Sequence, residues 1–203
     1  MGQTAHFVHG FTAGQLKGRA RSGLICALFG SAWMYWAVVF SGHPTPLWFL
    51  IVTLLAITLT VWAILRIRAF RRLLLSPAEL THWMRFRKFF WIDFGIEWGL
   101  CSIAAFLLAR VGRFDLIPQA FGVIIGLHFL PLAIVFSARR YYWTGGIMVI
   151  AAVGSLIIPR GEVRNIVACA SIGLTLWVTG IFVLYRISSA SEVQATSMHS
   201  RAQ

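Results

Sequence analysis

The chain has 203 residues, of which 59% are hydrophobic and only 12% are charged, and its formal net charge is +12. Soluble domains carry about 25% charged residues, so this composition excludes an ordinary soluble fold and indicates a chain that a lipid bilayer solvates. The basic residues gather at the ends of apolar runs, which is the pattern of membrane topology, and nucleic-acid binding is therefore not expected.

The N-terminal segment, residues 1–22, is predicted to be cytoplasmic. It carries Lys17, Arg19 and Arg21 directly before the first apolar run. A basic segment before an apolar one is also typical of a signal peptide. This run is long, however, and no A-x-A cleavage site follows it, so we expect an uncleaved first span.

Six apolar runs follow, and most have the roughly 17–25 residues that cross about 30 Å of hydrocarbon. They cover residues 24–40, 46–65, 89–109, 116–136, 142–158 and 166–185. Backbone polar groups in lipid must be paired within their own segment, so each run is predicted to be a helix. Residues 23–186 are therefore predicted to form an all-α bundle of about six transmembrane helices. The fifth run is short and rich in glycine, which indicates a thin or partly unwound span.

Lys and Arg residues are unequally divided between the two sides of this bundle. The N-terminal segment, the connections after the second and fourth runs, and the tail hold most of the 18. The opposite side holds only Arg110, Arg113, Arg160 and Arg164. The positive-inside rule therefore predicts that both termini are cytoplasmic. The tail, residues 187–203, is polar and lacks aromatic residues, and is predicted to be disordered.

The connection from Arg66 to Lys88 carries seven basic residues and a helix-start signal. Residues 76–79, Ser-Pro-Ala-Glu, form a capping box with proline at the first helical position, so the third helix is predicted to begin near Pro77. The bilayer is the expected partner of the chain, and this basic connection is a candidate site for anionic lipid. Topology alone also accounts for its charge, and we favour that simpler interpretation.

Three ionisable residues lie inside the predicted spans, where such residues are costly and therefore suggest function. Asp93 and Glu97 are one helical turn apart on the third span, and His128 lies on the fourth. Glu97 and His128 are each 8 residues from the cytoplasmic end of their run, which is about 12 Å at 1.5 Å per residue. Neighbouring antiparallel helices would bring them together. Gln119, further along the fourth span, adds another polar group.

Proline and glycine residues surround this predicted polar site. Pro131 has no N–H, which predicts a kink and an unpaired carbonyl close to His128. Two small-residue contact motifs are present, formed by Gly95 with Gly99 and by Gly122 with Gly126. Glu97 and His128 point away from these glycine faces. If the two glycine faces pack on each other, Glu97 and His128 cannot also meet, and the sequence leaves this open.

Two interpretations of the polar site have similar weight. Glu97 and His128 form either a protonatable site that relays protons or binds a small polar or cationic solute, or a hydrogen bond that only fixes helix register. In the second case Asp93 would pair with Arg139 or Arg140. A metal site is less favoured, since no H-E-x-x-H or Cys/His spacing is present, and no cofactor is expected.

Residues 126–133, Gly-Leu-His-Phe-Leu-Pro-Leu-Ala, followed by Tyr-Tyr-x-Thr-Gly at 141–145, resemble segments of a family of small uncharacterised bacterial multi-pass membrane proteins. The resemblance covers the fourth and fifth spans and implies a bacterial inner-membrane protein, without implying any activity. The leading functional hypothesis is a small permease-like or solute- and proton-binding protein. A non-catalytic scaffold or accessory subunit of a larger membrane complex is the alternative, and a membrane-embedded enzyme is third. Homo-oligomerisation is left open.

Overall fold

The computed structural model describes residues 11–42, 44–135 and 138–201, and all regular secondary structure in these ranges is helical. The α-helices are α1 (Ala13–Val39), α2 (Pro46–Phe70), α3 (Pro77–Arg110), α4 (Ile117–Val135), α5 (Arg140–Gly154) and α6 (Glu162–Arg201). Short 3₁₀ helices, η1 (Phe114–Leu116) and η2 (Ser155–Ile157), precede α4 and follow α5. The predicted all-helical fold is confirmed.

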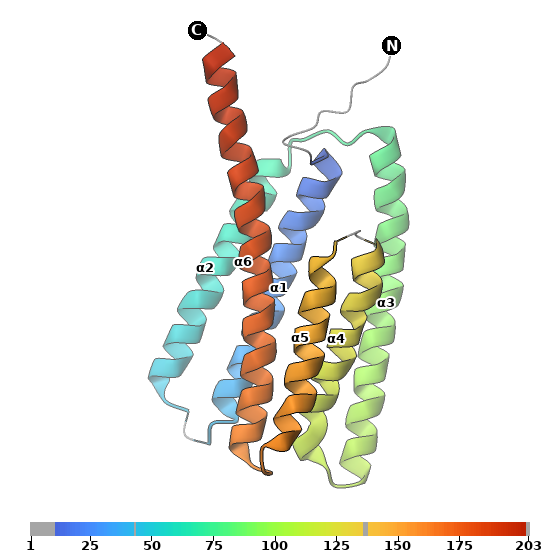
Figure 1. Ribbon diagram of the computed structural model, residues 1–203, viewed down its shortest axis with the longest axis vertical. Helices are drawn as coiled ribbons and strands as arrows, with labels where there is room; N and C mark the ends of the chain where they lie inside the picture. Colours follow the sequence, from blue (N-terminus) through green and yellow to red (C-terminus); the bar gives the residue numbers. More distant parts are fainter. Residues whose placement is uncertain (1–10, 43, 136–137, 202–203) are drawn as a thin grey trace.

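The helices run alternately up and down beside one another (Figure 1). The long helices α1 and α6 pack along each other, α2 lies against α1, and α5 lies against α6 on the other side. Helix α4 packs on α5, and α3 packs mainly on α4 at the edge of the bundle. The start of α1 and the end of α6 therefore lie at the same end of the molecule (Figure 1).

Five helical segments among the described residues are long and apolar enough to cross a membrane. They are Ala13–Val39, Pro46–Phe70, Arg87–Arg110, Phe114–Ile134 and Glu162–Ser189. Helices α2 and α3 expose large apolar side chains along their length, such as Leu54 and Ile57 on α2 and Ile96 and Ile103 on α3. Water would solvate so much apolar surface poorly, whereas lipid solvates it well. The arrangement is consistent with a helical membrane bundle.

The fifth predicted span corresponds to α5 and η2 together. Helix α5 has 15 residues and η2 adds 3, so α5 falls short of the length of the other five segments. The number of spans and their orientation accordingly stay predictions.

Helix α1 begins earlier than the apolar run indicates. Its first turn is fixed by a capping box, in which the Gln15 backbone N–H donates to the Thr12 hydroxyl and the Thr12 N–H donates to the Gln15 side chain. The predicted N-terminal segment, residues 1–22, thus includes the start of a helix from Ala13. Lys17, Arg19 and Arg21 in the following turns interrupt the apolar run without interrupting the helix, because Lys and Arg are good helix formers.

Helix α6 also extends beyond its predicted end. It continues through Arg201, although residues 187–203 are predicted from composition to be disordered. This segment contains alanine, glutamate, glutamine and methionine, all of which favour helix. The apolar part of α6 has already nucleated the helix, and such residues extend it, since nucleation is the costly step.

The predicted start of the third helix at Pro77 is confirmed, and its capping box also joins α3 to α1. The Ser76 backbone N–H donates to Glu79 Oε2 over 2.9 Å, while the backbone N–H of Gly14 donates to Glu79 Oε1 over 2.9 Å. Partial burial alone would raise the pKa of the Glu79 carboxyl, but hydrogen bonds from Thr12, Gly14 and Ser76 outweigh it and lower the pKa to about 2.

This lowered pKa predicts an acid-sensitive connection between the two helix starts. The ordinary pKa of the carboxyl is 4.5, so its stabilising contribution is complete above that pH and is lost as the pH falls towards about 2. We expect Glu79→Gln to lower the thermal midpoint, measured by circular dichroism, at pH 7 and to differ less from the unmodified protein at pH 3. Other groups titrate in both proteins and cancel in the difference. An equal deficit at both pH values would contradict a role for the charged carboxylate.

Candidate functional site

The three ionisable residues predicted within the spans lie together between α3 and α4. His128 Nδ1 is 3.1 Å from Asp93 Oδ2 and 3.4 Å from Glu97 Oε2. Asp93 and Glu97 are one turn apart on α3, so their carboxylates emerge on the same face. That face meets α4, which places the imidazole between the two acids. We call Asp93, Glu97 and His128 the carboxylate–histidine cluster.

The cluster is buried and its charges are unbalanced. The exposed fractions of the His128, Asp93 and Glu97 side chains are 9%, 15% and 8%. Among the described residues, Arg139 and Arg140 form no ion pair with Asp93, so the predicted pairing is replaced by the contact with His128. Nor do His128 Nδ1 and Asp93 Oδ2 have a hydrogen-bond partner within the part of the chain that the structure describes. Among the described side chains, the two acids therefore face one imidazole and form no ion pair with another cation.

The two glycine motifs pack differently, which explains how the cluster forms. Gly126 approaches α5 so closely that a Cβ there would lie 2.9 Å from the carbonyl oxygen of Gly145. Gly95 and Gly99 on α3 have open space on their glycine face. The glycine faces of α3 and α4 thus do not meet each other. Helix α4 turns its glycines towards α5 and leaves His128 facing α3.

Gln119 and Pro131 are the other polar and kink residues predicted around the site, and neither belongs to the cluster. Gln119 is buried, and its Nε2 donates to Asn165 Oδ1 on α6 over 3.2 Å. This bond joins α4 to α6 at the end of the bundle opposite the termini. Pro131 lies inside α4, which continues to Val135. Of the predicted polar residues, only Asp93, Glu97 and His128 lie together.

A cavity of about 500 Å³ reaches Glu97 and His128. It separates α1 from α3, and α4 forms its inner wall. Most of its lining is apolar, and aromatic side chains from four helices contribute to it: Phe29, Phe90, Trp91, Phe94, Phe129 and Tyr141.

Away from Glu97 and His128, the cavity is lined by basic side chains. Arg21 of α1 and Arg87 of α3 both line it, and the Arg21 guanidinium lies 4.6 Å from the centre of the Trp83 ring. Arg87 precedes Glu97 by 10 residues, or about 15 Å along α3. Tyr141 of α5 also lines the cavity, and its hydroxyl is 2.6 Å from the hydroxyl of Ser22 on α1. The cavity is thus basic at one end and acidic at the other.

No motif or periodicity in the sequence indicated the α1 wall of this cavity. The positive-inside rule explains Arg21 by topology alone, and Ile25, Cys26 and Phe29 have the sequence character of ordinary lipid-facing or packing residues, yet all four line the cavity. Periodicity predicts which residues share a helix face, but it does not predict which two helices stay apart. Regarding metals, no group of three or more His, Cys, Asp or Glu side chains in the described ranges is arranged to hold an ion.

In the described residues, the chain is thus all-helical, with five helices long and apolar enough to cross a membrane, and the buried carboxylate–histidine cluster lies beside a cavity. The chain matches no protein-family model, no curated protein and no solved structure. The resemblance of residues 126–145 to small bacterial membrane proteins stays a prediction.

Proposed function

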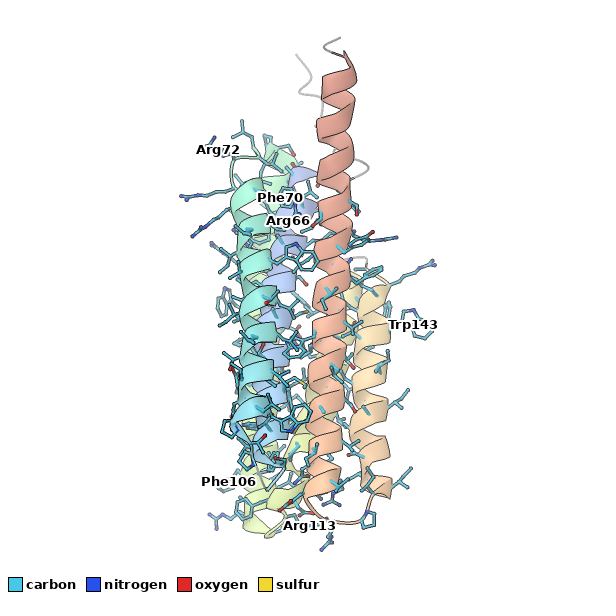
Figure 2. The ribbon with its side chains drawn as sticks, turned by 90° about the vertical axis from the view of Figure 1, so that its left-hand side faces the viewer. Arg66, Phe70, Arg72, Phe106, Arg113 and Trp143 are labelled. Atoms are coloured by element: carbon cyan, nitrogen blue, oxygen red, sulfur yellow. The ribbon has the colours of Figure 1, made fainter. Side chains whose placement is uncertain are left out.

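We propose that this chain is a six-span protein of the bacterial inner membrane with both termini in the cytoplasm. The 15 residues of α5 and 3 of η2 give about 28 Å at 1.5 and 2.0 Å per residue, close to the 30 Å hydrocarbon thickness. In Figure 1, α5 runs beside α4 and α6 as a crossing helix would. The basic connection after α2 supports the orientation, with Arg66 and Arg72 near one end of the bundle and Arg113 near the other (Figure 2).

We further propose that the protein is permease-like and that the carboxylate–histidine cluster takes up and releases protons, both by itself and when it binds a solute. The observation that carries this proposal is the cavity that reaches Glu97 and His128. His128 Nδ1 is within 3.4 Å of both carboxylates, so a positive charge on the imidazole is stabilised by both acids. Ionisable groups inside a span are retained at a cost, which fits a transport site better than a packing role.

The test is proton flux into liposomes that contain the purified chain and a trapped pH-sensitive dye. We expect an acid-dependent flux that Glu97→Gln lowers by roughly tenfold or more, because general acid–base groups contribute factors of at least that size. Glu162→Gln is the matched control, since Glu162 is exposed at the start of α6, away from the cavity.

Two results would contradict the proposal. One is an unmodified chain that gives no flux above empty liposomes. The other is a Glu97→Gln protein that gives undiminished flux. The thermal midpoint of each variant shows whether a loss comes from unfolding, and Asp93→Asn provides a second substitution within the cluster for that case.

A non-catalytic scaffold is the second candidate function. Helix α3 is exposed along most of its apolar length, and the open glycine face at Gly95 and Gly99 would allow another helix to approach closely. Co-purification with a larger membrane complex, unchanged by Glu97→Gln and without proton flux, would favour this function over the first.

A further inference from the structure

The charges of the cluster leave one of its two carboxylates without a positive partner. Asp93 and His128 form the closer contact, at 3.1 Å, and balance each other when both are ionised. Glu97 is then the extra acid, and it is also the acid that lines the cavity. A buried carboxylate without a positive partner is costly. Either a bound proton or a bound cation must therefore compensate Glu97.

The surrounding side chains do not supply that cation. Titratable and charged groups face the cavity or the cluster from three helices: Arg21 and Cys26 from α1, Arg87 and Cys101 from α3, and Tyr141 from α5. Neither arginine forms an ion pair with Asp93 or Glu97 in the described part of the chain. The α6 contribution to the lining is Leu176, which is apolar. The compensating charge consequently has to come from a ligand or from solvent.

The cavity walls select the kind of cation. A volume of about 500 Å³ lies within the range of small-molecule sites. A small inorganic ion would lose its hydration shell there and find few oxygen ligands in exchange. An organic cation with an apolar body would instead contact Phe29, Phe94 and Phe129, whose ring faces attract positive charge.

We propose that the cavity binds a monovalent lipophilic cation, with its charge beside Glu97 and its apolar body against the aromatic walls. This inference rests on the proposed function and names the substrate class of the same site. Before binding, Glu97 carries a proton and the cluster is neutral. The bound cation replaces that proton, so one proton leaves for each cation that enters and the total charge is conserved. Such exchange would couple cation movement to a proton gradient.

The test is direct binding of tetraphenylphosphonium to the purified full-length chain in lipid nanodiscs, with empty nanodiscs subtracted. We expect saturable binding that weakens as the pH falls, with about one proton released per cation in weakly buffered solution. Tetraphenylborate, which has nearly the same shape and the opposite charge, should bind at least tenfold more weakly. Glu97→Gln should weaken tetraphenylphosphonium binding at least tenfold, and Glu162→Gln should not change it.

Asp93→Asn is the second variant, because it alters the charge balance without altering the cavity lining. With Asp93 neutral, a protonated His128 would compensate Glu97, so cation binding should again fall at least tenfold in a protein that stays folded.

Four outcomes would overturn the inference. Equal binding of the borate anion would show that shape alone is recognised, and unchanged binding by both cluster variants would place the cation elsewhere. Absence of saturable tetraphenylphosphonium binding, with acid-dependent proton flux still present, would reject this substrate class and leave the proposed function standing. Absence of both would reject the proposed function itself.

Discussion

Gly145→Ala is expected to destabilise the folded chain, whereas the same substitution at the adjacent Gly146 is expected to be neutral or slightly stabilising. A Cβ at Gly145 would overlap the carbonyl oxygen of Gly126 on α4, while a Cβ at Gly146 meets nothing within 4 Å. Backbone atoms cannot rotate away as a flexible side chain does, so α4 and α5 must separate. Overpacking of this kind costs about 1–3 kcal/mol, and alanine otherwise favours helix over glycine by up to about 1 kcal/mol.

The three free cysteines provide the measurement. Cys26, Cys101 and Cys169 are all buried, so a thiol-reactive fluorescent dye should label the protein as it unfolds on heating. A loss of about 2 kcal/mol should lower the midpoint by roughly 4–8 °C. Equal midpoints for the Gly145→Ala and Gly146→Ala proteins would show that α4 and α5 are not in backbone contact. Since Gly126 precedes His128 by 2 residues, the Gly145→Ala protein should also lose proton flux.

The helices could be predicted from the sequence because a bilayer leaves an apolar chain few alternatives. Backbone groups in hydrocarbon must pair locally, so each long apolar run becomes a helix. The ends were less predictable, because they depend on residues outside the apolar run. The capping box at Thr12 and Gln15 starts α1 well before residue 24, and α6 continues to Arg201 through a polar but helix-favouring segment.

The cluster was only partly predictable. Helical periodicity puts Asp93 and Glu97 on one face, and counting from the span ends puts His128 at a similar depth. Which face of α4 meets α3 depends on α5, where Gly145 receives Gly126. Adjacent glycines at 145 and 146 look alike in the sequence, and only packing separates their roles. The cavity was beyond prediction, since α1 and α3 are joined at their starts by the bond from Gly14 to Glu79 and both line the cavity further along.

The burial of Arg164 is another feature that the distribution of charges along the sequence does not predict. The positive-inside rule places Arg164 on the less basic side of the membrane and predicts nothing about its burial. In the structure it is only 4% exposed, and its guanidinium donates to a carboxylate oxygen of Asp115 in η1. Two elements distant in sequence, η1 and the first turn of α6, meet there. Arg113 reaches the same carboxylate over 3.1 Å from a more exposed position.

Asp115→Asn is therefore expected to be strongly destabilising, since it leaves the buried Arg164 without a counter-charge. Removing one member of a buried ion pair costs about 3–5 kcal/mol, and the partial exposure of Asp115 reduces this to roughly 2–3 kcal/mol. Arg113→Gln is the matched control, because an exposed ion pair contributes at most about 1 kcal/mol. The cysteine-labelling midpoint measures both variants.

The double variant Asp115→Asn with Arg164→Gln separates a buried-charge penalty from the loss of a contact. Removing the arginine as well should restore part of the stability lost in Asp115→Asn, because no unpaired charge is then buried. A double variant less stable than Asp115→Asn alone would mean that Arg164 stabilises the chain through its packing. If the Arg113→Gln protein were as unstable as the Asp115→Asn protein, the ion pair of Asp115 with Arg113, rather than the one with Arg164, would be the stabilising one.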